Sequence, residues 1–267
     1  MASLYTEQSK NITKTWLLMA GVFAVVIALG WFFSYYFQNP TILTAFAVFA
    51  IVLQIVSYWY SDKIVLSLAG ARPASREEFF DLYTTVENLS ITAGLPMPKI
   101  YVVEDPAPNA FATGRDAKHA VVCATTGLLA ILDKTELEGV IAHELSHIGN
   151  RDMLVSTVVV VLVGFISIIA DFFLRSFLWG GMRRSNDREG NGGGVIMIIG
   201  IIFAILAPLI GTLMQLAISR KREYLADASG ALLTRYPEGL ANALKKIGAY
   251  AQPLRHQAST IAHLYIA

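Results

Sequence analysis

The sequence has few charged residues and a single cysteine. Charged residues make up 15% of its 267 residues, whereas soluble domains average about 25%. The net charge is +1 without a basic run, which excludes a strong electrostatic attraction to nucleic acid. Cys123 has no second cysteine to pair with, so an internal disulfide is excluded and a reducing compartment is indicated. With 55% hydrophobic residues and a mean hydropathy of +0.53, the composition indicates a membrane protein.

The longest uncharged stretch lies between Lys14 and Asp62. Within it, residues 15–37 and 41–60 are separated by "QNP". Each run is long enough to cross a hydrocarbon core of about 30 Å at about 1.5 Å per residue. A cleavable signal peptide is disfavoured, because the first apolar run is too long and a second follows it. We therefore predict a transmembrane hairpin over residues 1–60.

Positive residues flank this hairpin on one side only. Lys10 and Lys14 precede the first run, Lys63, Arg72 and Arg76 follow the second, and the connecting turn has none. Because positive residues are retained in the cytoplasm, both ends of the hairpin are predicted to be cytoplasmic.

Two further apolar runs, residues 153–170 and 195–218, predict a second membrane hairpin over residues 153–218. Their glycine-rich linker carries three arginines, which argues against an external position. The alternative is a buried hairpin of core helices that does not cross the membrane. The fold class predicted is a mainly α membrane protein with four candidate transmembrane helices and a cytoplasmic α+β domain.

Residues 61–152 have the character of a soluble domain. They contain an amphipathic helix over residues 75–95 and strands over residues 99–104 and 119–126, with turn residues between the strands. A helix follows, for which Thr135 is a suitable N-cap. The pattern therefore predicts the first part of the cytoplasmic domain.

That last helix carries "AHELSHIGNRD" and is predicted to end at Gly149-Asn150. His143 and His147 are four residues apart, so both imidazoles lie on one helix face and can bind one metal ion. Glu144 is offset from this face and is left free to act on a water molecule at the metal.

A catalytic zinc ion normally has three protein ligands. Residues 219–267 form the second part of the domain and open with "SRKREYLADASG". Glu223 can complete a His₂Glu set of the zincin (gluzincin-like) kind, and Asp227, one turn later, can fix the tautomer of a ligand histidine. The alternative is a solvated helix face, with both acids paired to Lys221 or Arg222.

Three motifs together resemble the HtpX family of membrane zinc metalloproteases, which are relatives of the CAAX prenyl endoproteases. The motifs are "NAFATG" (109–114), "EGVIAHELSHIGNRD" (138–152) and "SRKREYLADASG" (219–230). Members of the family usually continue into a short polar C-terminal segment, whereas this chain ends at "IAHLYIA". Substrate contacts are therefore not assigned at that end.

The resemblance implies a zinc metalloendopeptidase in the bacterial inner membrane that degrades misfolded membrane proteins. It implies one Zn²⁺ per chain held by His143, His147 and Glu223, with Glu144 as the catalytic acid and base. Unfolded polypeptides and the lipid bilayer are the expected partners, and the oligomeric state is left open. Two alternatives remain, an endoprotease for prenylated C-terminal peptides and a catalytically silent scaffold that keeps a structural zinc.

Two features of the predicted hydrolysis stay open at the level of sequence. Tyr224 and Arg222 are both candidate donors to the oxyanion. An extended substrate is expected to pair with the edge of a sheet, and either residues 119–126 or "NAFATG" can supply that edge.

Overall fold

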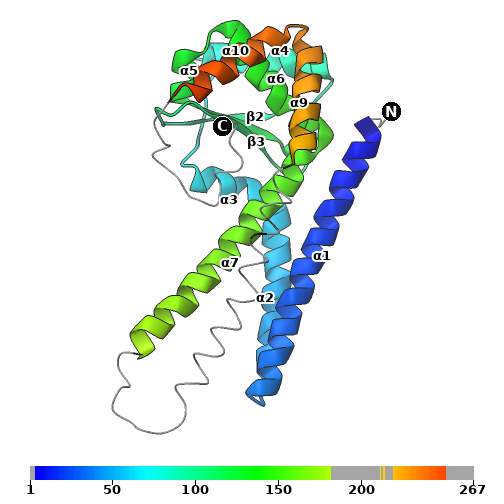
Figure 1. The fold of residues 1–267 in the computed structure, drawn as a ribbon, viewed down its shortest axis with the longest axis vertical. Helices are drawn as coiled ribbons and strands as arrows, with labels where there is room; N and C mark the ends of the chain where they lie inside the picture. The colour runs from blue at the N-terminus through cyan, green and yellow to red at the C-terminus, as the bar shows by residue number, and fades with distance from the viewer. Residues whose placement is uncertain (1–3, 182–210, 212, 214–218, 251–267) are drawn as a thin grey trace.

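The computed structural model describes residues 4–181, 211, 213 and 219–250. Figure 1 shows a head built from a small sheet and several helices, with the long helices α1, α2 and α7 extending below it; α1 and α2 form a hairpin, and α7 diverges from them towards its end. The first segment of the chain and the end of the described chain are both near the head. The fold is mostly helical, as predicted.

The predicted hairpin of residues 1–60 forms as helices α1 (Leu4–Tyr36) and α2 (Pro40–Trp59). The turn places Gln38 at a positive φ of 52°, and the Asn39 side chain accepts a hydrogen bond from the Thr41 N–H at the start of α2. Both helices are long and apolar enough to cross a membrane. With 33 residues, α1 is about 50 Å long, so it extends well beyond a hydrocarbon core of about 30 Å.

The head contains a four-stranded sheet in the order β1-β2-β4-β3. Its strands are β1 (Arg72–Pro73), β2 (Lys99–Val103), β3 (Ala110–Thr113) and β4 (Val121–Thr125). Strands β2 and β4 are parallel, and β1 and β3 pair with them in antiparallel fashion. Both predicted strands are present, but β4 lies inside the sheet. The prediction that residues 119–126 offer a free edge is therefore wrong, whereas β3 of "NAFATG" is an edge strand.

Helices of the head cover the sheet and form one hydrophobic core with it. Leu82, Val102, Val122, Ile141 and Leu145 are among its fully buried side chains. The predicted helix of residues 75–95 begins later, at Phe80, after a turn. The helices are α3 (Ser61–Leu68), α4 (Phe80–Ala93), α5 (Thr126–Ile131), α6 (Lys134–Asn150), α9 (Arg220–Thr234), α10 (Pro237–Gly248) and the 3₁₀ turn η1 (Ala117–His119).

The N-cap of α6 is Asp133, two residues before the predicted Thr135. The Asp133 side chain accepts a hydrogen bond from the Glu136 N–H, and the Glu136 carboxylate accepts one from the Asp133 N–H. This is a complete capping box, which satisfies two helix-end donors at once. The helix ends at Asn150 as predicted, and Arg151 follows with a positive φ of 58°.

Helix α7 (Asp152–Gly181) follows Arg151 after a bend of 85°. From Met153 to Val163 nearly every side chain is buried, because α7 packs against α1, α2, α3 and β3. The described residues thus contain two candidate membrane spans, or three if the bent pair of α6 and α7 counts as one. The predicted run 195–218 falls almost entirely outside the described residues, as does the glycine-rich linker before it.

Candidate metal centre

The two histidines of "HELSH" lie on one face of α6, as their spacing predicts. The Nε2 atoms of His143 and His147 are 3.1 Å apart, and their rings meet edge to face at 4.8 Å between centroids. Both nitrogen atoms therefore face the same point in space.

Glu223 approaches that point from α9. Its Oε2 atom lies 3.6 Å from His143 Nε2 and 3.7 Å from His147 Nε2. A tetrahedral zinc ion with bonds of about 2.0–2.1 Å holds its ligand atoms about 3.3 Å apart. The three donor atoms, all within 4.8 Å of one another, thus have the chemistry and the spacing of three corners of such a site.

A glycine allows α9 to pack closely on α6. A Cβ atom added at Gly230 would lie 3.1 Å from the backbone nitrogen of His143, closer than most side chains approach a neighbouring backbone. Gly230 lies on the same helix as Glu223. The contact therefore sets how near this carboxylate comes to the histidines.

Each histidine has a carboxylate beside its other ring nitrogen. Asp227 Oδ1 lies 2.9 Å from His143 Nδ1, and Asp152 Oδ2 lies 3.3 Å from His147 Nδ1. Asp152 was not predicted, although it is the last letter of "HIGNRD". The signal that points to it is an acid two residues after the asparagine that ends the helix. Such partners fix the tautomer and orientation of a metal-binding imidazole.

The carboxylates also control the charge of the histidines in the metal-free chain. Burial lowers the pKa of His143, but the carboxylates of Asp227, Glu223 and Glu144 outweigh burial and raise that pKa to about 9. Burial likewise lowers the pKa of His147, and its acidic neighbours, Asp152 first, raise that pKa to about 10. The two imidazoles in turn hold the pKa of Glu223 well below its usual range. A metal ion bound here replaces protons on both histidines, because only neutral imidazole binds a metal.

Glu144 lies next to the histidines and is buried, with an exposed fraction of 3%. Burial raises the pKa of its carboxyl group, although the two histidines oppose this. The backbone N–H of Ala112 in β3 lies close enough to the carboxylate to oppose the rise as well. The carboxyl group therefore stands between the histidine pair and the edge strand.

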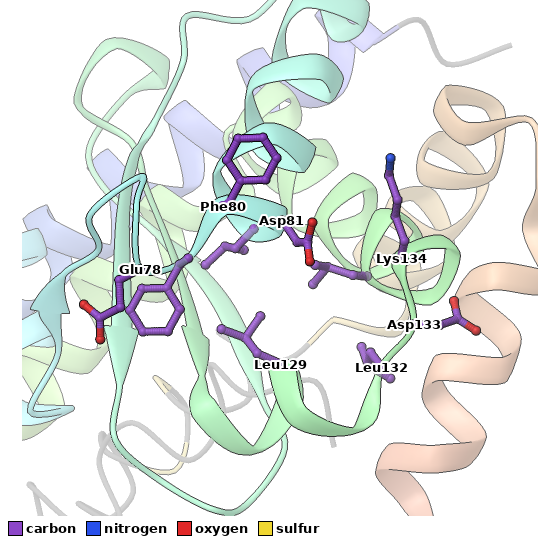
Figure 2. A pocket seen from close by; sticks show the side chains of 10 residues that line it. Glu78, Phe80, Asp81, Leu129, Leu132, Asp133 and Lys134 are labelled. Atoms are coloured by element: carbon purple, nitrogen blue, oxygen red, sulfur yellow. The ribbon is translucent and has the colours of Figure 1, made fainter.

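Figure 2 shows a separate hollow of about 330 Å³ at the N-terminal end of α6. Six of its ten lining side chains are apolar, Phe80 and Leu129 among them, and charged residues such as Lys134 complete the lining. It has no residue in common with the histidine cluster. Neither its position nor its lining connects it with the metal centre.

Comparison with known proteins agrees with this site. Residues 76–261 match Peptidase family M48. Two relatives are each described as "Protease HtpX homolog". The relative from Thermoanaerobacter pseudethanolicus is 48% identical, with 99% of this chain and 89% of the relative covered. The relative from Tropheryma whipplei is 47% identical, with 98% and 88% covered.

Among solved structures, the crystal structure of S. mikatae Ste24p is similar with a TM-score of 0.49 and 20% identity. The likeness covers 91% of this chain and 59% of that one. The match to the family spans more than half of the sequence, and the named relatives align along nearly all of it. The chain therefore belongs to peptidase family M48 and is a membrane metalloprotease of the HtpX type.

Proposed function

We propose that the chain hydrolyses peptide bonds with one Zn²⁺ held by His143, His147 and Glu223. The observation that carries this proposal is the meeting of three donor atoms within 4.8 Å, two from α6 and one from α9, with Glu144 buried beside them. Zinc bound at such a site lowers the pKa of a water molecule and polarises a carbonyl group.

Glu144 supplies the proton transfers. Its raised pKa brings the carboxyl group nearer to the range in which one group both takes and returns a proton at neutral pH. It takes a proton from the attacking water and returns it to the leaving amine. Asp227 and Asp152 orient the two histidines. Each carboxylate lies beside the Nδ1 atom of its histidine, whereas the Nε2 atoms are the proposed zinc ligands.

Strand β3 is the sheet edge that we assign to the substrate backbone, although its four residues are buried in the described structure. The Thr125 N–H donates to the Asn109 carbonyl oxygen at 2.9 Å, and the direction of backbone groups alternates along an antiparallel pair. Ala110 and Ala112 therefore turn their N–H and C=O groups away from β4, where the Ala110 N–H donates to Asn109 Oδ1 at 2.8 Å. The effect of the Ala112 N–H on the Glu144 carboxyl group indicates that this edge lies beside the proton-transferring group. An extended peptide pairing here is bound through its backbone, which suits substrates of many sequences.

We place the enzyme in a bacterial inner membrane as a four-span protein whose active site faces the cytoplasm. The support is the cluster of cations at both ends of the first hairpin and their absence from its turn. Misfolded or unfolded membrane proteins are the proposed substrates, because backbone pairing selects an extended conformation rather than a sequence. The oligomeric state is not assigned.

The family assignment favours this function over the two alternatives. A structural zinc site is usually closed by four protein ligands, whereas the part of the chain that the structure describes brings three together. An enclosed chamber for prenylated peptides requires more helices than the four spans proposed here.

The test separates the roles of the two glutamates in detergent-purified protein. Glu144→Gln keeps all three ligands, so zinc should remain near one per chain while casein cleavage falls by about 10²–10⁴-fold. Glu223→Ala removes a ligand, and metal content and cleavage should fall together. Full proteolysis by Glu144→Gln, or unchanged zinc affinity in Glu223→Ala, would show that these roles are misassigned.

A further inference from the structure

One polar side chain of the first membrane helix reaches the metal centre. Asn11 of α1 is buried, with an exposed fraction of 2%. Its Nδ2 atom lies 2.5 Å from Asp152 Oδ1 and 3.1 Å from the carbonyl oxygen of Asn150. A side-chain amide nitrogen has two N–H donors. Two acceptors at these distances therefore use both donors of Asn11.

The two acceptors lie on opposite sides of the bend between α6 and α7. Asn150 is the last residue of α6, Asp152 is the first of α7, and Arg151 between them has a φ of 58°. One turn of α1 earlier, Gln8 Nε2 donates to the carbonyl oxygen of Gly149 at 2.5 Å. Helix α1 thus joins the end of the metal-binding helix to the start of the next one. Figure 1 shows the N-terminal end of α1 beside the head.

The bond to Asp152 fixes a carboxylate that also faces a predicted metal ligand. Its Oδ1 atom is held by Asn11 and its Oδ2 atom lies 3.3 Å from His147 Nδ1. Asp152 is 3% exposed, and a buried carboxylate requires donors to remain charged. Arg222 Nε, at 3.9 Å from Oδ1, is a further positive neighbour. Asn11 is the neutral donor that sets the rotation of the carboxylate.

We propose that Asn11 is a positioning residue of the metal centre. It acts through Asp152 on His147, so that the N-terminal end of the first membrane helix is part of the metalloprotease site as well as an anchor. This rests on the proposed function, because it assumes that His147 binds zinc. Removal of a carboxylate behind a ligand histidine weakens metal binding by about 10–100-fold, which is the upper limit for the loss of the side chain that supports this carboxylate.

The test is zinc affinity, measured on the full-length chain in detergent by competition with a chelator of known affinity. Asn11→Leu keeps the size of the side chain and removes both donors, and we expect zinc binding to weaken by up to about 10–100-fold. Excess zinc should then return proteolysis towards the wild-type rate, which a general folding defect would not allow. Asn11→Ala, which makes no steric demand, should behave in the same way.

Thr15→Val is the matched control, because Thr15 is equally buried on α1 and its hydroxyl donates only to the Asn11 carbonyl oxygen of its own helix. Its zinc affinity should equal that of the wild type. Asn11→Leu added to Asp152→Ala should weaken zinc binding no further than Asp152→Ala alone, because both changes interrupt one chain of contacts.

Wild-type zinc affinity in Asn11→Leu or Asn11→Ala, beside a Glu223→Ala variant that loses zinc, overturns this proposal and leaves the proposed function standing. A wild-type chain that binds no zinc overturns the proposed function itself.

Discussion

At the scale of single residues, each of the two histidines has its own carboxylate partner. Asp227 supports His143 from α9 at 2.9 Å, and about half of its side chain is exposed. Asp227→Ala should therefore leave the fold intact and weaken zinc binding by about 10–100-fold, an effect between those of the wild type and Glu223→Ala. Chelator competition measures it. An affinity equal to the wild type would mean that Asp227 does not orient His143.

The two histidines could be predicted from the sequence, whereas Asp152 could not, because only the histidines lie within one regular helix. His143 and His147 follow from helix periodicity, which fixes their common face. Asp152 lies five residues after His147, beyond Arg151, whose positive φ turns the chain through the bend. Helical spacing does not apply across such a turn. The partner of His147 was therefore not predictable from periodicity.

At the scale of elements, some strands and helix ends could be predicted from the sequence and others could not. Strands β2 and β4 were predicted because they are apolar runs of β-branched residues. Their neighbour β1 was missed because it has only two residues. The β3 segment was named as a candidate sheet edge, but it follows two prolines, so its strand bounds were not predicted. Thr135 was the predicted N-cap of α6 because Glu138 follows it by three residues. Asp133 has the same spacing to Glu136. Only the contacts of the side chains distinguish the two.

The packing of α9 on α6 leads to a prediction about Gly230. In Gly230→Ala, the new methyl group would lie 3.1 Å from the His143 backbone nitrogen. Helix α9 would have to move outward and take Glu223 with it. Overpacking of this kind costs about 1–3 kcal/mol, more than the roughly 1 kcal/mol that alanine contributes to helix propensity. We expect a lower melting temperature in detergent and weaker zinc binding.

Gly248→Ala is the control for that experiment. Gly248 ends α10, and a Cβ atom there would meet no atom within 4 Å. Its melting temperature should stay unchanged or rise slightly. If Gly230→Ala matches Gly248→Ala in both measurements, the close approach of α9 does not set the geometry of the centre.

At the scale of the whole molecule, the metal centre stands where the long helices enter the head. Helix α1, about 50 Å long, exceeds a hydrocarbon core of about 30 Å, and the contacts of Asn11 lie in its N-terminal part. The turn at Gln38 lies at the far end of the hairpin from the head (Figure 1). The cation pattern therefore predicts that the head and the turn between α1 and α2 lie on opposite sides of the membrane.

Cysteine labelling of intact cells with a membrane-impermeant maleimide tests the sides. Gln38 and Ser67 are both exposed and suit labelling. The native Cys123 should stay unlabelled, because it is fully buried and burial raises the pKa of its thiol. Because the cations at both ends of the hairpin keep those ends in the cytoplasm, Gln38→Cys should react from outside and Ser67→Cys only after the cells are opened. Ser185→Cys, in the linker of the second hairpin, should also react from outside if four spans are present. External labelling of Ser67→Cys would place the head, and the metal centre with it, on the wrong side of the membrane for the proposed function.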